Sequence, residues 1–360
     1  MNGLVAIALR IVHHTKQRRL NAASFHQTVV GVDQIDIESL YSQILFGDNM
    51  DCLSRSYSVE RACADEGGRA AAAGRQSQKA IWIASYPKSG NTWVRVFIHN
   101  LMRELRGAAE GAQDINALDD WTRREGLTQS FARRLGKSAQ DASPVEIAAA
   151  RPLVQADLVG RHDGPIFIKT HNAVANVEGH PTINFDVTLA AIYIVRNPLD
   201  VAVSYAHHSA LPIERIIDTM ADRAKFVEGG ERRVYEFTGS LSFHAASWMS
   251  VPYRPVLALR YEDLLAAPER TFGRLAAFLR LQPNARQLRH AIEKSSFAEL
   301  ARQEEAQGFV EKPQQAERFF RVGKAGQWKE ALSATQVKAI ITAHAPMMMR
   351  FGYVREVCGG

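Results

Sequence analysis

The segment Ala80–Leu101, AIWIASYPKSGNTWVRVFIHNL, reads as a buried strand, a tight loop and an amphipathic helix. A strand that turns directly into the N-terminus of a helix commonly holds a phosphate. In the P-loop pattern GxxxxGK[ST], the lysine follows the last glycine and reaches the β- and γ-phosphates. Here the frame from Ser85 to Thr92 has Asn91 at that position, and its lysine is Lys88, inside the loop. The segment therefore predicts a phosphate-binding loop whose cation serves a different chemistry.

Beyond this segment, short apolar runs rich in Ile and Val alternate with helical patterns. Such runs are typical of strands buried on both faces of a parallel sheet. The alternation predicts an α/β fold, a P-loop-like doubly wound parallel sheet flanked by helices in a single catalytic domain. Ligands of such sheets bind beyond the carboxyl ends of the strands. The predicted strands are Ile81–Ser85, Ile166–Thr170, Ala190–Val195 and Val256–Tyr261.

The N-terminal part of the chain differs from the rest in composition. The stretch Asp65–Lys79, DEGGRAAAAGRQSQK, is small, polar and interrupted by glycines, as linkers are. We therefore expect residues 1–78 to be a weakly structured extension and residues 79–355 to form the catalytic domain. Met50 is an alternative site for the initiation of translation, and the sequence is compatible with initiation at Met1 or at Met50.

Charge and cysteine content bear on partners and compartment. The 360 residues carry a net charge of +6 and a pI near 9.3, which suits an anionic ligand but suits nucleic acid or an acidic membrane equally well. Cys52, Cys63 and Cys358 form neither a CxxC pair nor a His-spaced cluster, so we expect no disulfide framework and no metal site. The chain shows no signal peptide and no run approaching the ~20 apolar residues of a membrane span. A reducing, cytoplasmic setting is the expectation.

Polar stretches follow the first two predicted strands. After the first, the backbone N–H groups of Ser89–Thr92 can converge on an anion at the helix N-terminus, where the helix dipole favours negative charge. After the second, KTHN places Lys169 and His171 at the strand exit. A lone histidine is more often structural than catalytic, but a position at the carboxyl end of a strand favours catalysis.

Cationic and hydroxyl groups lie near the ends of the other strands. Arg196 comes directly after the third strand and Ser204 lies two turns into the next helix, within reach of a second anion. A local ion pair between Arg196 and Asp200 is the competing interpretation. Tyr261 stands at the end of the fourth strand, and Arg321 lies beside two glycines in RVGKAGQW. No strand ends in the lone Asp that a Walker-B site uses to hold Mg²⁺. The pattern favours a nucleotide with two separate anionic ends over a triphosphate.

With these residues in place, the chain resembles the cytosolic-type sulfotransferases, which use 3′-phosphoadenosine 5′-phosphosulfate. The shared motifs occur in the family's order from about residue 80 to 355. They are the 5′-phosphosulfate loop YPKSGxTW at Tyr86–Trp93, K-x-H at Lys169–His171, the 3′-phosphate motif RNPxDVAVSxxHH at Arg196–His208, RYEDL at Arg260–Leu264, SSF at Ser295–Phe297 and RxGxxGxW at Arg321–Trp328.

The resemblance implies a role for each matched position. Lys88 would contact the bridging oxygen of the phosphosulfate, and His171 would be the catalytic base, with Lys169 and Ser204 completing the catalytic set. The residues implied to bind the donor are Lys88, Ser89, Gly90, Asn91 and Thr92 at the 5′-phosphate, Trp93 stacked on adenine, Arg196, Ser204, Arg321 and Gly323 at the 3′-phosphate, and Tyr261, Ser295 and Phe297 along the adenosine.

Sulfuryl transfer explains a lysine inside the loop. As the S–O bond to the donor breaks, negative charge grows on the oxygen left with the 5′-phosphate, and Lys88 can stabilise it there. Transfer should be in line, and a histidine of near-neutral pKa is a suitable base for the incoming hydroxyl. His207 and His208 are the next candidates for that base. This chemistry requires no metal.

The function expected is transfer of a sulfuryl group to a hydroxyl, or an amine, of a small-molecule acceptor. The alternatives are a P-loop nucleotide phosphotransferase, which the missing GK[ST] disfavours, and a non-catalytic nucleotide-binding module. Nucleic acid and membrane are not expected as partners, and a homodimer is left open. Val322 stands where many relatives carry a lysine, so one possible contact with the donor phosphate is absent and the affinity for the donor is in question. Segments 107–160, 207–240 and 300–320 are expected to shape the acceptor pocket.

Overall fold

The computed structural model describes residues 78–107, 111–251 and 254–354. The predicted extension at residues 1–78 lies outside these ranges apart from its last residue, and so do Cys52, Cys63 and Cys358. The predictions about them therefore stay predictions. In the described part, no helix is both long enough and apolar enough to cross a membrane.

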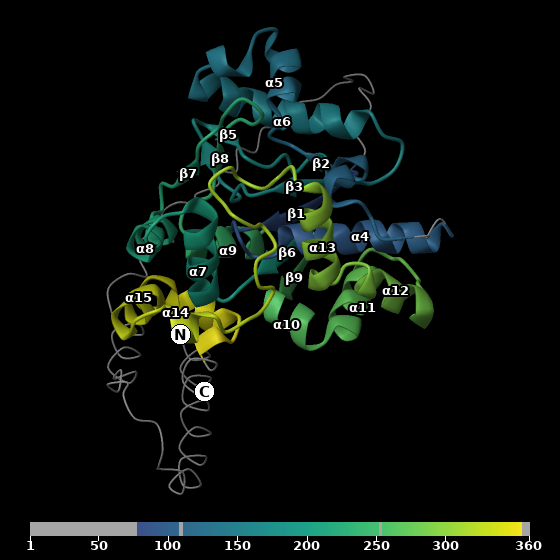
Figure 1. Ribbon diagram of the computed structural model, residues 1–360. Coiled ribbons are helices and arrows are strands. Elements are labelled where there is room, and N and C mark those ends of the chain that lie inside the picture. The colour runs from purple at the N-terminus through teal and green to yellow at the C-terminus, as the bar shows by residue number, and fades with distance from the viewer. Residues whose placement is uncertain (1–77, 108–110, 252–253, 355–360) are drawn as a thin grey trace, which may run out of the picture. The chain divides into compact units, whose positions relative to one another are not determined.

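A parallel sheet organises the described residues, with five strands in the order β2-β3-β1-β6-β9 (Figure 1). β1 (Ala80–Ser85) lies between β3 (Ile166–Thr170) and β6 (Thr188–Val195), and all three run in the same direction. β2 (Thr122–Arg124) extends the sheet beyond β3, and β9 (Val256–Arg260) extends it beyond β6. The predicted doubly wound α/β fold is confirmed.

Alternate side chains of β1 explain why this strand lies in the middle of the sheet. Ile81 and Ile83 belong to one apolar cluster, while Trp82 and Ala84 belong to another on the opposite face. A strand with apolar side chains on both faces has to be covered by helices on both sides. The only polar atom of the Trp82 side chain, Nε1, is satisfied because it donates a hydrogen bond to Thr188 Oγ1 at 2.8 Å.

Helices form a layer on each face of the sheet (Figure 1). One layer contains α4 (Asn91–Leu105), α10 (Tyr261–Ala266), α11 (Pro268–Phe278) and α12 (Ala285–Glu293). The opposite layer contains α6 (Pro144–Gly160), α7 (Pro198–Ser209), α8 (Ile213–Ala221), α9 (Leu241–Met249) and α15 (Ala334–Arg350). The remaining elements are η2 (Ile115–Asp120), α5 (Thr128–Leu135), η3 (Ala139–Asp141), the hairpins β4 (Asn176–Val177) with β5 (His180–Pro181) and β7 (Phe226–Val227) with β8 (Glu236–Phe237), α13 (Phe297–Gln307) and α14 (Trp328–Ala331).

Element boundaries differ from the sequence-based expectation at four places. β1 begins one residue early, at Ala80, β6 begins two residues early, at Thr188, and Tyr261 begins α10 instead of ending β9. β2 was not predicted, because three residues are too short to show a periodic pattern. The turn into α10 matters for function, since it places the Tyr261 ring at the carboxyl end of the sheet beside Gly90.

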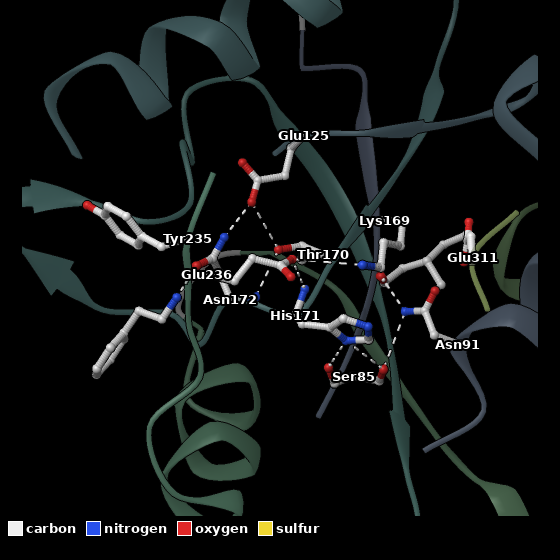
Figure 2. Close-up of polar contacts among 12 residues, drawn as sticks. Ser85, Asn91, Glu125, Lys169, Thr170, His171, Asn172, Tyr235, Glu236 and Glu311 are labelled. Atoms are coloured by element: carbon white, nitrogen blue, oxygen red, sulfur yellow. Dashed lines mark hydrogen bonds and ion pairs between the residues drawn. The ribbon is translucent and has the colours of Figure 1, made fainter. Parts of the chain in front are cut away.

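A buried ion pair joins the β2 edge of the sheet to α6. Arg151 Nη1 lies 2.9 and 3.0 Å from the two carboxylate oxygens of Glu125, and both side chains are at most 2% exposed. Thr170 and Asn172, at the exit of β3, also donate to this carboxylate (Figure 2). Glu125 thereby ties the helix to the strand end that carries His171.

We expect Glu125→Ala to lower the free energy of unfolding by about 3–5 kcal/mol, because it leaves the Arg151 charge buried without its partner. Asp157→Ala is the matched control, since it removes the exposed 3.7 Å ion pair of the same helix with Arg134 and should cost about 0–1 kcal/mol. Urea unfolding followed by circular dichroism measures both. Equal costs for the two variants would contradict a structural role for the buried pair.

Candidate active site

The loop between β1 and α4 has the geometry of an anion site. Gly90 caps α4 in the left-handed region at φ 107°, no side chain caps the first turn, and that turn holds no acidic residue. Lys88 also lies in the left-handed region at φ 68°, which is unusual for a residue other than glycine. Asn91 donates from Nδ2 to Ile83 O at 2.9 Å and thus fastens the loop to its own strand. The backbone N–H groups at the helix start are left for a ligand.

Glycine is required at position 90 for a second reason. A Cβ built there would lie 2.8 Å from Tyr261 Cδ2. The Tyr261 ring also meets Trp93 edge-on, at 5.5 Å between centroids, and carries the Arg196 guanidinium 4.4 Å from its centroid. The Tyr261 ring of α10 therefore contacts the loop, the start of α4 and Arg196, the residue after β6.

Lys88 is partly buried beside groups that carry no negative charge. Its Nζ lies 3.1 Å from His208 Nδ1 and 4.3 Å from the centroid of the Phe319 ring. Burial, and then the positive charge of Arg196, lower the pKa of Lys88 to about 7. Burial and the charge of Lys88 likewise lower the pKa of His208 to about 3. An ammonium in such surroundings is stabilised by an anionic ligand.

Arg196 makes contact with backbone carbonyls instead of Asp200. Its Nη1 donates to Lys88 O at 3.1 Å and its Nη2 to Lys324 O at 3.3 Å, while its buried Nε has no partner among the described residues. Asp200 accepts from the backbone N–H of Gly326 at 2.7 Å and of Trp328 at 3.1 Å. The local Arg196–Asp200 ion pair is therefore not formed, and the guanidinium stays available to an anion.

The exit of β3 brings Lys169 and His171 together with Glu236 (Figure 2). The backbone N–H of His171 donates to Glu236 Oε1 at 2.9 Å, and Lys169 Nζ lies 3.9 Å from the same oxygen. His171 Nδ1 lies 2.7 Å from the carbonyl oxygen of Ser85. Because only a protonated nitrogen can donate to a carbonyl, Nδ1 carries the hydrogen and Nε2 keeps its lone pair.

Burial determines the charge state of this cluster. Burial, followed by the charge of Lys169, lowers the pKa of His171 to about 3. Burial raises the pKa of Glu236, but Lys169 and His171 outweigh it and bring that pKa down to about 2. Near neutral pH the cluster therefore consists of a neutral imidazole beside a lysine–glutamate pair.

One cavity of about 840 Å³ joins the loop to the β3 exit. It brings together most of the side chains that the sequence singled out, namely Lys88, Gly90, Asn91, Thr92, Trp93, Lys169, His171, Arg196, Ser204, Tyr261, Phe297, Arg321 and Gly323. Ser89 and Ser295 do not line it, and both are buried. Ser295 Oγ donates to Ala291 O at 2.6 Å, and its carbonyl accepts from Trp93 Nε1 at 2.8 Å, so Ser295 orients the tryptophan.

The C-terminal loop closes the cavity beside Arg196. Arg321 donates to Gln327 Oε1 at 2.7 Å, and Gly323 has φ 63°. A Cβ on Gly323 would lie 2.2 Å from the Phe297 ring, so only glycine allows the loop to approach α13 this closely. Val322 lines the cavity as an apolar residue between these two.

Several residues of the site were not singled out from the sequence, although they lie in the segments 207–240 and 300–320 that were expected to shape the acceptor pocket. Glu236 lies on the two-residue strand β8, and Phe319 and Arg233 lie in segments without a recognisable pattern. His208 was considered only as a substitute base, although its place in the HH pair one helical turn after Ser204 could have signalled the contact with Lys88. In the part of the chain that the structure describes, no group of three or more His, Cys, Asp or Glu side chains is arranged to hold a metal ion.

Comparisons with known proteins show which family this chain resembles. Residues 78–352 match the family described as the sulfotransferase domain. Sulfotransferase 1A1 of Bos taurus is 26% identical to this chain over 278 residues, which cover 74% of this chain and 83% of that protein. Sulfotransferase 1B1 of Canis lupus familiaris is 26% identical over 269 residues, covering 71% and 79%. The solved structure of retinol dehydratase in complex with androsterone and inactive cofactor PAP is 19% identical, has a TM-score of 0.50 and covers 76% of this chain and 81% of that chain. At that identity the structural likeness supports the fold alone.

We expect Gly90→Ala to destabilise the protein by about 1–3 kcal/mol, because it adds left-handed strain and a clash with Tyr261. Gly179→Ala is the matched control, since Gly179 has φ 79° but no atom within 4 Å of its Cβ position. Gly179→Ala should therefore lower the stability only through the backbone strain. Thermal unfolding of the two variants measures the difference, and equal losses would show that the contact with Tyr261 is immaterial.

Proposed function

The chain belongs to the sulfotransferase domain family, and from this premise we propose that it transfers a sulfuryl group from 3′-phosphoadenosine 5′-phosphosulfate to the hydroxyl of a small-molecule acceptor. The observation that carries the proposal is that one cavity brings Lys88 and Arg196, neither of which forms an ion pair with a described residue, next to a neutral His171. A donor with two anionic ends matches the two cations, and an acceptor with a dissociable proton matches the neutral imidazole.

The donor end of the cavity suits a nucleotide with separate phosphates. The 5′-phosphosulfate would lie on the uncapped N-terminus of α4 with its bridging oxygen toward Lys88. The 3′-phosphate would lie between Arg196, Ser204 and Arg321, all of which line the cavity. Retinol dehydratase, which shares this fold, is described in complex with the inactive cofactor PAP, the donor without its sulfuryl group.

His171 is oriented to accept the acceptor's proton. Its Nδ1–H is held by Ser85 O, so the proton would go to Nε2, the nitrogen left free. The pKa of about 3 keeps the imidazole neutral throughout the physiological range, and the negative charge of a bound donor would raise that pKa during transfer. Glu236 supports the arrangement by holding the backbone of His171 and the side chain of Lys169.

The proposed step is an in-line exchange at sulfur. The acceptor oxygen attacks as its proton passes to His171 Nε2, and the bond from sulfur to the 5′-phosphate oxygen breaks. The electron pair stays on that oxygen, where Lys88 stabilises it. The products are the sulfate ester of the acceptor, 3′,5′-adenosine bisphosphate and one proton, which His171 returns to water. Positioning and electrostatic stabilisation supply the acceleration.

A nucleotide kinase is the weaker candidate. It would need a lysine at position 91 and an acidic residue at a strand end to hold Mg²⁺, whereas the chain has Asn91, whose amide binds the backbone of β1, and Arg196. The direct test is a screen with ³⁵S-labelled donor against phenols, alcohols, sugars and amines, with γ-labelled ATP in parallel. Transfer of label from ATP alone would overturn the proposal.

We expect His171→Ala to lower transfer to an aliphatic alcohol by roughly 10²–10⁴-fold, because an alcohol cannot ionise unaided. An acidic phenol should lose less and recover as the pH rises, whereas Lys88→Ala should cost the same with either acceptor, since Lys88 lies on the donor side. His207→Ala, which alters an exposed histidine of α7, is the control. Near-full alcohol sulfation by His171→Ala would contradict the assignment and make His208 the next candidate.

The lowered pKa of Lys88 predicts proton uptake on nucleotide binding. In the free protein Lys88 loses its proton as the pH rises through about 7, and a bound phosphate raises that pKa, so binding is favoured below pH 7 and weakens above it. At about pH 8 the phosphates, with a second pKa near 6, are already ionised, so uptake of nearly one proton would come from the protein. Calorimetry of 3′,5′-adenosine bisphosphate in buffers of different ionisation enthalpy measures the uptake.

Lys88→Arg is the control for this measurement, because arginine stays charged at every accessible pH. The variant should bind the nucleotide without taking up the proton. Equal uptake by the wild type and Lys88→Arg would assign the proton to another group.

A further inference from the structure

The end of the cavity beyond His171 is lined by charged side chains. Three of them are acids, and each has a cationic partner in the structure. Glu125 is bound by Arg151, Glu236 lies beside Lys169, and Glu311 accepts from Arg95 Nη1 at 2.9 and 3.0 Å. None of the three acids therefore adds an uncompensated negative charge to this end of the cavity.

The arginines at the same end are not all compensated. Arg124 is paired with Asp119. Arg232 and Arg233 also line the cavity and are exposed, and among residues 78–107, 111–251 and 254–354 their side chains form no hydrogen bond or ion pair. This part of the cavity consequently has an excess of positive charge.

The backbone around Arg233 is fixed independently of its side chain. A β-bridge pairs Leu127 with Arg233, Val234 N donates to Gly126 O at 2.9 Å, and Gly230 N donates to Arg233 O at 2.7 Å. Arg233 is thus held on a braced segment at the wall of the cavity. Truncation of its side chain removes none of these bonds.

The charge of Arg233 acts on the acceptor side of the reaction centre. After burial and Lys88, it is the third cause that lowers the pKa of His208, and it also acts on the pKa of Glu236 and of Tyr205. The pKa of Lys88 itself is set by burial, Arg196 and Glu304. The charge of Arg233 therefore acts on His208 and is not among the causes that set the pKa of Lys88.

We propose that Arg233, with Arg232 beside it, binds an oxyanionic group of the acceptor, a carboxylate or a phosphate, so that the enzyme sulfates a hydroxyl on an acidic small molecule. The inference rests on the proposed sulfuryl transfer and deepens it. A guanidinium presents parallel N–H donors that match two oxygens of one anion, and a side chain without an internal partner need break no existing bond to do so.

The test measures acceptor binding in the presence of saturating 3′,5′-adenosine bisphosphate, so that recognition is read without transfer. Calorimetry compares 4-hydroxybenzoate, 4-hydroxyphenylacetate and 3-(4-hydroxyphenyl)propanoate with their methyl esters. A second arm compares 4-hydroxybenzylphosphonate with its diethyl ester. The proteins are wild type, Arg233→Ala, Arg233→Lys and, as matched control, Arg289→Ala, which removes an exposed arginine of α12 outside the cavity.

We expect the wild type to bind at least one acid about 10- to 100-fold more tightly than its ester, the range of a charge-assisted hydrogen bond. Arg233→Ala should lose that preference by weakening the acid alone, Arg233→Lys should keep part of it, and Arg289→Ala should match the wild type. The arm with the larger preference identifies carboxylate or phosphate. Equal affinity of acids and esters in the wild type, or equal weakening of both by Arg233→Ala, would overturn the inference.

The same samples separate this inference from the proposed function. Labelled donor replaces the bisphosphate in a second series, and transfer to the tested acceptors is measured. Tight binding of an acid without any sulfation would count against the proposed transfer and leave the recognition by Arg233 standing. Sulfation of acids and esters at equal kcat/KM would support the transfer and overturn the recognition.

Discussion

The site depends on two cations, Lys88 and Arg196, that are held close together and form no ion pair with any residue that the structure describes. Burial, and then repulsion by the like charge of Arg196, lowers the pKa of Lys88. The arrangement is retained because the surrounding backbone fixes it, since Arg196 grips the carbonyl of Lys88 itself and that of Lys324. A bound phosphate would relieve this repulsion.

Acidic side chains near the site fasten loops and do not neutralise these cations. Asp200 accepts from the backbone of Gly326 and Trp328, and Glu262 accepts from Asn197 N at 2.9 Å. Glu304 accepts from the backbone N–H groups of Phe319 and Phe320 at 2.7 and 2.8 Å. Each carboxylate holds one wall of the cavity in place through N–H donors. The walls are thus rigid, and the positive charge stays directed at the ligand, as electrostatic preorganisation requires.

The sequence was sufficient for the fold and for the loop between β1 and α4 because both are encoded locally. The two apolar faces of β1 alternate along consecutive residues, and Lys88, Gly90 and Arg196 occupy turns that directly follow strands. Contacts between distant segments were out of reach. Glu236 meets His171 across 65 positions, and Ser295, expected along the adenosine, instead holds Trp93 from 202 positions away. No periodicity or turn preference encodes such pairs, since they arise only when the sheet and its crossovers are assembled.

The acceptor half illustrates a different limit. In the sequence, its acidic residues and arginines alternate without a pattern that indicates a binding site. Only the structure shows which of the acids already have partners. Once Glu125, Glu236 and Glu311 are matched with Arg151, Lys169 and Arg95, the arginines at 232 and 233 are what distinguishes this surface. The two ends of the cavity differ in the exposure of their cations, since Arg196 is buried and Lys88 is partly buried, whereas Arg232 and Arg233 are exposed on the β7–β8 hairpin. A buried cation favours strong, uniform binding of a common donor. An exposed one discriminates between acceptors at little cost to the fold.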